Sequence, residues 1–181
     1  NYEQIYKCDV TEEWSADHTH QILPSYFNTY NESRGSFTHQ LFTTDQDRNT
    51  KYYWNKDWKN LTLSGYAFLI TPTNFENEFI KELFEKMDDN FDKSPNDTKF
   101  LIVVRLNKKA SWWNLTCNYE IIDTIKAGTR FYSRRLYARD KSRSPDITTG
   151  QNKDKRVAIQ TRHDLVVLYR DIMTPTRINP L

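Results

Sequence analysis

Glycine and cysteine are both scarce in this chain of 181 residues, which has four glycines and two cysteines. The two cysteines, Cys8 and Cys117, can form at most one disulfide bond, so the chain is not a small domain held together by a disulfide framework. Four glycines leave no Gly-rich loop for a cofactor.

No uninterrupted apolar run is long enough to span a bilayer, and we expect no membrane partner. No secretory signal is visible, but the chain begins at Asn1, and we expect it to be a mature or excised product.

Aromatic residues, by contrast, make up 14% of the chain, which excludes a disordered tail because such tails are poor in aromatics. The length suits one domain with a real core. The formal net charge is +2, so overall charge identifies no partner. We expect an N-terminal extension over residues 1–20, one domain over 21–172, and a C-terminal tail over 173–181.

Metal-ligating and nucleophilic motifs are also missing. His18 and His20 lie two residues apart beside Asp17, without a cysteine or histidine at a standard zinc spacing, so we expect no metal site. Ser64 lies in Leu-Ser-Gly, which lacks the flanking glycine pair of a nucleophile elbow. The sequence therefore does not indicate a hydrolase.

Two apolar runs and a helical pattern are the clearest structural signals. Residues 66–70 (YAFLI) and 99–106 (KFLIVVRL) are typical of buried strands. Between them, apolar residues recur at spacings of three and four, which predicts an amphipathic helix with Phe75, Phe79, Ile80, Leu83, Phe84, Met87 and Phe91 on its buried face. Thr73 and Glu76 match the capping-box pattern and predict that the helix begins there. Further strands are expected near residues 36–42, 121–125, 156–160 and 164–170.

A strand, a crossing helix and a second strand form a βαβ unit, which implies parallel strands. Ligands of open parallel sheets bind at the carboxyl ends of the strands, so residues 71–75 (TPTNF) lie at the expected mouth of a site. A purely structural interpretation also accounts for this corner. In that interpretation Pro72 ends the strand, Thr73 caps the helix, and Phe75 packs into the core.

The order of these segments resembles the core of the phosphorylated-CTD-interacting-factor family, the cap-specific adenosine methyltransferases of messenger RNA. The family has a Leu-Ser-Gly segment, a strand, an Asn-Pro-Pro-Phe motif and an acidic helix, and here residues 63–65 and 75–83 stand in the matching places. Trp112 and Trp113 follow the second strand, as the family's tryptophan does. The resemblance implies an α/β fold with a methyltransferase-like (Rossmann-like), mostly parallel sheet flanked by helices.

The same resemblance implies S-adenosylmethionine as cofactor and an adenine amine as methyl acceptor. In the family motif, the Asn oxygen and the first Pro carbonyl accept the two amine hydrogens while the aromatic ring stacks on the base, so catalysis is positioning and electrostatics without a metal. The corresponding catalytic residues here would be Thr71, Pro72, Thr73, Asn74 and Phe75. The carboxamide is missing from its place in either alignment and only one proline remains, so we expect a degenerate site.

A basic stretch over residues 130–143 (RFYSRRLYARDKSR) mixes cations with aromatic residues. Arginine binds phosphates, and aromatic rings or guanidinium planes stack on bases. This composition predicts an RNA-binding site made of Arg130, Phe131, Tyr132, Arg134, Arg135 and Arg139. The alternative interpretation is a solvated basic strand and loop.

We therefore expect a methyltransferase-like pseudoenzyme, nuclear or cytoplasmic, that binds RNA or serves as a protein subunit of a larger RNA-processing complex. One alternative is an active S-adenosylmethionine-dependent RNA adenosine methyltransferase. Stabilisation by the cofactor would favour it, because a ligand that binds only the native state raises its stability. The other alternative is a secreted or viral glycoprotein domain that binds a host protein, with a Cys8–Cys117 disulfide and glycans on the sequons at Asn31, Asn60, Asn96 and Asn114.

Overall fold

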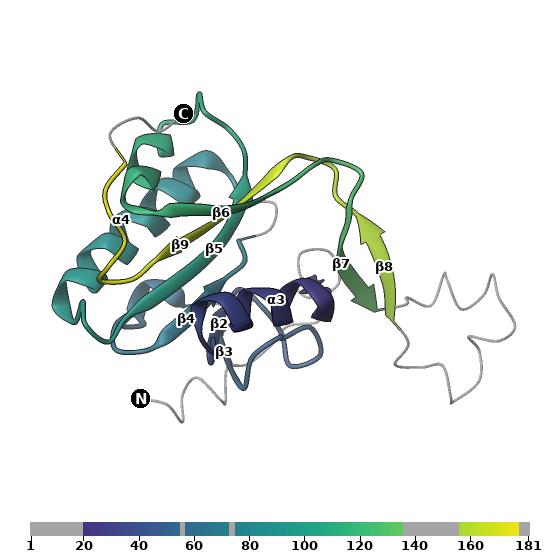
Figure 1. Ribbon diagram of the computed structural model, residues 1–181, viewed down its shortest axis with the longest axis horizontal. Coiled ribbons are helices and arrows are strands. Elements are labelled where there is room, and N and C mark those ends of the chain that lie inside the picture. The colour runs from purple at the N-terminus through teal and green to yellow at the C-terminus, as the bar shows by residue number, and fades with distance from the viewer. Residues whose placement is uncertain (1–19, 55–56, 73–74, 136–155, 178–181) are drawn as a thin grey trace, which may run out of the picture.

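The computed structural model of the chain describes residues 20–54, 57–72, 75–135 and 156–177. These residues form two sheets, two α-helices and two short 3₁₀ helices (Figure 1). In chain order the elements are β1 (Gln21–Ile22), α3 (Pro24–Arg34), β2 (His39–Leu41), β3 (Tyr52–Trp54), η1 (Trp58–Asn60), β4 (Ala67–Ile70), α4 (Asn77–Lys93), β5 (Lys99–Arg105), η2 (Trp113–Asn118), β6 (Glu120–Ile125), β7 (Arg130–Arg135), β8 (Arg156–Gln160) and β9 (Leu165–Arg170).

The larger sheet has six strands in the order β3-β2-β4-β5-β9-β6. Strands β3, β2, β4 and β5 are parallel to one another. Strand β9 is antiparallel to both of its neighbours, β5 and β6. The sheet is therefore mixed, with its antiparallel pairs on one side.

The predicted βαβ unit is confirmed as β4, α4 and β5. Strands β4 and β5 pair in parallel from Ala67 opposite Lys99 to Ile70 opposite Ile102. The helix between them begins at Asn77, and Glu76 stands at its N-cap without a side-chain capping bond. The helix start predicted from the capping box is thus wrong, and Thr73 lies outside the described residues.

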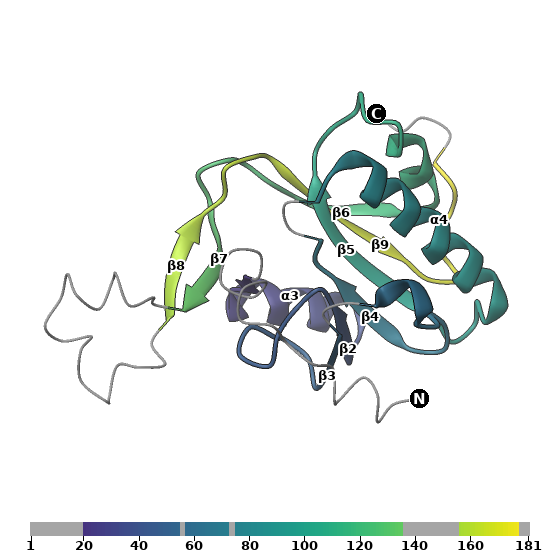
Figure 2. The same cartoon turned by 180° about the vertical axis from the view of Figure 1, so that it is seen from behind.

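The main sheet buries apolar side chains on both faces, as its Val-, Ile- and Leu-rich strands require. Along β5, Phe100, Ile102 and Val104 pack in the cluster that includes α4 and the tryptophans around η2. The alternate residues Leu101 and Val103 pack in a second cluster with α3. Figure 2 accordingly shows α4 in front of the sheet and α3 behind it.

The smaller sheet is antiparallel, in the order β1-β7-β8, and stands to one side of the main sheet (Figure 1). Strands β7 and β8 follow the carboxyl end of β6 and lead into the amino end of β9. They lie at the same end of the main sheet as the corner after β4, because β6 and β5 run in the same direction. Phe131 and Tyr132 of β7 join the α3 side of the core.

The predicted fold class, a Rossmann-like, mostly parallel sheet flanked by helices, is wrong. The main sheet is mixed, a second sheet is fully antiparallel, and the described helices do not alternate with the strands. Between β2 and β3, residues 42–51 form turns instead of a crossover helix. That segment is rich in Thr, Asp and Asn, whose side chains bond to the nearby backbone and favour turns over helices.

Candidate functional site

Thr71, the first residue of the corner after β4, is held in place by hydrogen bonds. Thr71 is buried, and its hydroxyl donates to the Leu41 carbonyl at 3.3 Å. The same hydroxyl accepts from Nε2 of the buried Gln40 at 3.4 Å. Pro72 is also buried, whereas Thr73 and Asn74 lie outside the described residues. The hydroxyl predicted to accept a substrate hydrogen is therefore committed to joining β4 to β2.

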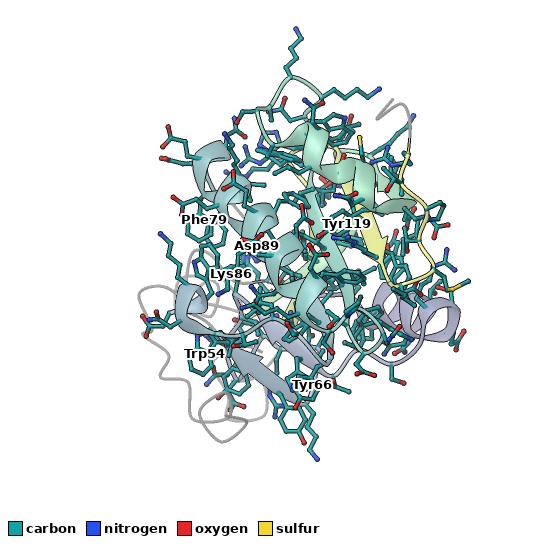
Figure 3. The ribbon with its side chains drawn as sticks, turned by 90° about the vertical axis from the view of Figure 1, so that its left-hand side faces the viewer. Trp54, Tyr66, Phe79, Lys86, Asp89 and Tyr119 are labelled. Carbon is teal, nitrogen blue, oxygen red and sulfur yellow. The ribbon has the colours of Figure 1, made fainter. Side chains whose placement is uncertain are left out.

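Phe75 belongs to an aromatic cluster at the start of α4. Its ring centroid lies 4.4 Å from that of Phe79 and 4.9 Å from that of Phe42, in an edge-on contact with the latter. Phe79, labelled in Figure 3, also contacts Trp58 at 5.0 Å. This packing agrees with the structural interpretation of Phe75, because its partly buried ring packs against two other rings of the core.

The segment after β2, residues 42–51, turns over the same end of the sheet and is held from several sides. The backbone N–H of Asn49 donates to Gln40 Oε1 at 2.7 Å. The Asn49 amide in turn bonds both the N–H and the carbonyl of Ile22, at 3.1 and 2.8 Å. Within this region Thr43 Oγ1 and Trp54 Nε1 are buried without a hydrogen-bond partner.

Asp47 forms an ion cluster that ties this segment to the β7–β8 hairpin. Its side chain is 3% exposed and accepts from Arg156 Nη1 at 2.8 Å, with Arg135 Nε at 3.8 Å. The Thr44 hydroxyl donates to its other oxygen at 2.9 Å. Arg156 also donates to the hydroxyl and carbonyl of Ser133, both at 2.9 Å. Asp47 therefore neutralises part of the basic stretch.

The residues predicted to bind RNA fall into different environments. Phe131 and Tyr132 are 0% and 6% exposed, so neither presents a ring face to a base. Arg134 is half-buried and donates to the Arg135 carbonyl at 3.1 Å. Arg130 is exposed at the start of β7. Arg139, the sixth predicted residue, lies outside the described residues.

Exposed cations do gather at the base of the hairpin. The Gly128 N–H donates to the Thr161 carbonyl at 2.8 Å, and the Thr161 N–H donates to the Thr129 carbonyl at 2.8 Å. Beyond them, Arg130 of β7 pairs with Gln160 of β8. These bonds bring together three exposed side chains, which we call the hairpin basic surface: Lys126, Arg130 and Arg162. Residues 126–135 and 156–163 contain six Lys or Arg residues and no Asp or Glu.

Sequence reasoning missed Lys126, Arg156 and Arg162, which lie outside the stretch chosen for its density of charge. The antiparallel pairing of β7 with β8 brings the second set of cations to the first. The pattern of residues 156–160, already predicted as a strand, was the signal that could have pointed to such a pairing.

Three of the four sequon asparagines are exposed: Asn60, Asn96 and Asn114. The fourth, Asn31, accepts the Phe37 N–H with its side-chain oxygen at 3.1 Å. Among the described residues, no group of three or more His, Cys, Asp or Glu side chains is placed to hold a metal ion. None of the described helices has the length and apolar character needed to cross a membrane.

Neither a protein-family model nor a curated protein sequence matches this chain.

Proposed function

We propose that this chain is a non-catalytic RNA-binding domain that contacts RNA phosphates through the hairpin basic surface. The observation that carries the proposal is the exposure of three cations, Lys126, Arg130 and Arg162, around the carboxylate of Asp164, whose Oδ1 accepts the Ala127 N–H at 2.8 Å. Arg130 and Arg162 form no side-chain ion pair or hydrogen bond within the described part of the chain, so both are available to an anion. The segment order that resembles cap-specific RNA methyltransferases supports RNA as the polyanion.

We infer the absence of methyl transfer from Thr71 and Phe75, the described ends of the corner after β4. An adenine amine needs an acceptor that is free to take its hydrogens, and the carboxamide of the family motif is missing there. Thr71 bonds Leu41 and Gln40 instead. Phe75 packs against Phe42 and Phe79. Thr71 and Phe75 thus serve the packing of the sheet and of α4.

The proposed mode of binding is electrostatic. Phosphate contacts position a nucleic acid but carry no sequence information. Because Phe131 and Tyr132 are buried, they do not supply the stacking that would add base contacts. We expect weak sequence preference and an affinity that falls steeply with salt.

The test compares two double variants of equal charge change. Arg130→Gln with Arg162→Gln removes two cations of the hairpin basic surface. Lys81→Gln with Lys93→Gln removes two exposed cations from α4, which covers the face of the main sheet opposite α3 and β7. Fluorescence anisotropy with a labelled single-stranded RNA should show at least about a fivefold loss of affinity for the first variant and a smaller loss for the second. Equal losses would mean that net charge alone drives binding.

A cofactor titration separates this proposal from an active methyltransferase. S-adenosylmethionine should leave the melting temperature unchanged, because a ligand raises stability only if it binds the native state. A clear stabilisation would show an intact cofactor site. In that case Thr43 Oγ1 and Trp54 Nε1, the unpartnered polar atoms near the corner, would be the first residues to substitute.

A further inference from the structure

A polar pocket lies at the opposite end of the main sheet from the corner and the hairpin. Its volume is about 580 Å³, within the range of small-molecule sites. It is formed where α3 ends, β5 and β6 begin, and the chain leaves β9. The lining residues are Ser33, Arg34, Gly35, Lys99, Glu120, Tyr169, Asp171, Met173, Thr174, Pro175 and Arg177.

Two arginines in the pocket bond neighbouring residues at the start of β6, Glu120 in the strand and Tyr119 just before it. Arg34 Nη2 donates to Glu120 Oε1 at 3.1 Å. Arg177 Nε donates to the Tyr119 carbonyl at 2.9 Å. Each guanidinium keeps one buried nitrogen without a partner, Nε of Arg34 and Nη1 of Arg177. Both nitrogens are closed to solvent, so they do not face the open volume of the pocket.

The acidic side chains of the pocket already have partners. The Tyr169 hydroxyl donates to Asp171 Oδ2 at 2.7 Å, and the Met173 N–H donates to Oδ1 at 2.8 Å. Glu120 is paired with Arg34 at 3.1 Å. The lining thus holds three cations against two carboxylates that are already bonded.

The third cation of the pocket lining, Lys99, has its ammonium group next to Gly35. A Cβ added to Gly35 would lie 3.1 Å from Lys99 Nζ, closer than most real Cβ contacts. Gly35 also has φ 92° and ψ 173°, a conformation that is nearly restricted to glycine. Gly35 therefore ends α3 beside the ammonium group. Burial raises the pKa of Asp171, but the hydrogen bonds from Tyr169, Met173 and Thr174 lower it below its usual value, and the positive charge of Lys99 adds to that lowering.

We propose that this pocket binds a phosphate monoester, with its phosphate held by Lys99, Arg34 and Arg177. Phosphate oxygens are acceptors only, and Lys99, whose side chain forms no hydrogen bond or ion pair within the described part of the chain, offers them a cationic donor beside the two arginines. Met173, 82% exposed, and Pro175 add an apolar side to the lining for the organic part of the ligand. The site is separate from the hairpin basic surface, so the two proposals can fail independently.

The probes are adenosine 5′-monophosphate, inorganic phosphate and adenosine, each titrated by calorimetry into the full chain at low salt. We expect the monophosphate to bind and adenosine not to bind. Weaker binding of inorganic phosphate than of the monophosphate would indicate an ester ligand, and equal binding would indicate free phosphate; both support the phosphate site. Binding of adenosine as tight as that of the monophosphate would overturn the proposal, as would no binding of either anion at millimolar concentration.

Substitutions then show where the ligand binds. Lys99→Gln should lower the affinity for adenosine 5′-monophosphate by at least about tenfold, as expected for the loss of a charge-assisted bond. Lys99→Arg should retain binding. The control is Lys93→Gln, an exposed lysine at the end of α4 and outside the pocket lining. If Lys99→Gln binds like the wild type while its melting temperature is unchanged, the proposal is wrong. If Lys99→Gln does not fold, Lys99→Arg and Arg34→Gln decide, and tight binding by Arg34→Gln would equally refute the site.

Discussion

The Asp47 ion cluster gives a quantitative prediction about what holds the hairpin to the main sheet. Asp47→Asn keeps the size of the side chain and removes its charge. The carboxylate is 3% exposed and lies 2.8 Å from Arg156, whose own side chain is 21% exposed. Removing one partner of a buried ion pair commonly costs 3–5 kcal/mol, because the other charge stays buried.

Two features of Arg156 reduce that cost. The guanidinium keeps its bonds to the Ser133 hydroxyl and carbonyl and to the Gln46 carbonyl at 3.0 Å. It also retains some contact with water. We therefore expect Asp47→Asn to lower the free energy of unfolding by about 2–3 kcal/mol.

Urea denaturation followed by tryptophan fluorescence measures this loss. The matched control is Asp45→Asn, since Asp45 is 60% exposed and its pair with Arg48 at 3.1 Å is worth at most about 1 kcal/mol. A double-mutant cycle of Asp47→Asn with Arg156→Met should give a coupling energy of about 1.5 kcal/mol or more. Equal effects of the Asp45 and Asp47 substitutions, or a coupling near zero, would refute the reasoning.

Two more substitutions test the packing of α4. Asn90→Ala should cost about 2 kcal/mol in urea denaturation, because Asn90 Oδ1 accepts the buried Leu63 N–H at 2.7 Å and that donor would lose its partner; a neutral result would mean that water replaces the amide. Asp88→Asn tests a titration: burial raises the pKa of Asp88 to about 6 despite Arg170 at 2.9 Å. The folded state then binds the proton more tightly than the unfolded state, so this contribution to stability is present below pH 4 and is lost as the pH rises through 6. The wild type should therefore lose stability relative to Asp88→Asn between pH 4 and 7 in urea titrations, and the opposite trend would show that the attraction to Arg170 outweighs burial.

The strand-helix-strand core was predictable because its signals are local. The apolar residues of α4 recur with helical spacing, and β4 and β5 are short, continuous apolar runs. The structure confirms these elements and also the strands at residues 120–125, 156–160 and 165–170. The direction of a strand within a sheet could not be predicted in the same way, because it depends on partners far away in sequence. The residues of β9 carry no local signal that it runs antiparallel between β5 and β6.

Helix α3 escaped prediction for a specific reason. Pro24 interrupts the short apolar patch at residues 21–27, a pattern typical of an irregular segment, whereas in the structure it occupies the first turn of the helix. Proline is favoured there, because its missing N–H would have no partner in any case. The helix buries only Phe27 and Tyr30, so its apolar pattern is weak.

The candidate RNA site was only partly predictable. Phe131 and Tyr132 are adjacent, and alternation in a regular strand places neighbouring side chains on opposite faces. The β7–β8 pairing shifts register between Arg130 and Tyr132, as at a bulge, and both aromatic rings are buried. Which cations remain exposed depends equally on Asp47, a residue far from the basic stretch in sequence.

The salt dependence of RNA binding tests the account's central claim most directly. The slope of log affinity against log salt should be steep for the wild type and shallower by about 1.4 for Arg130→Gln with Arg162→Gln, which is two lost phosphate contacts on a single strand. The Lys81→Gln and Lys93→Gln control should keep nearly the wild-type slope. If the hairpin variant keeps the wild-type slope, or if the wild type binds no RNA at low salt, the hairpin basic surface is not an RNA-binding site.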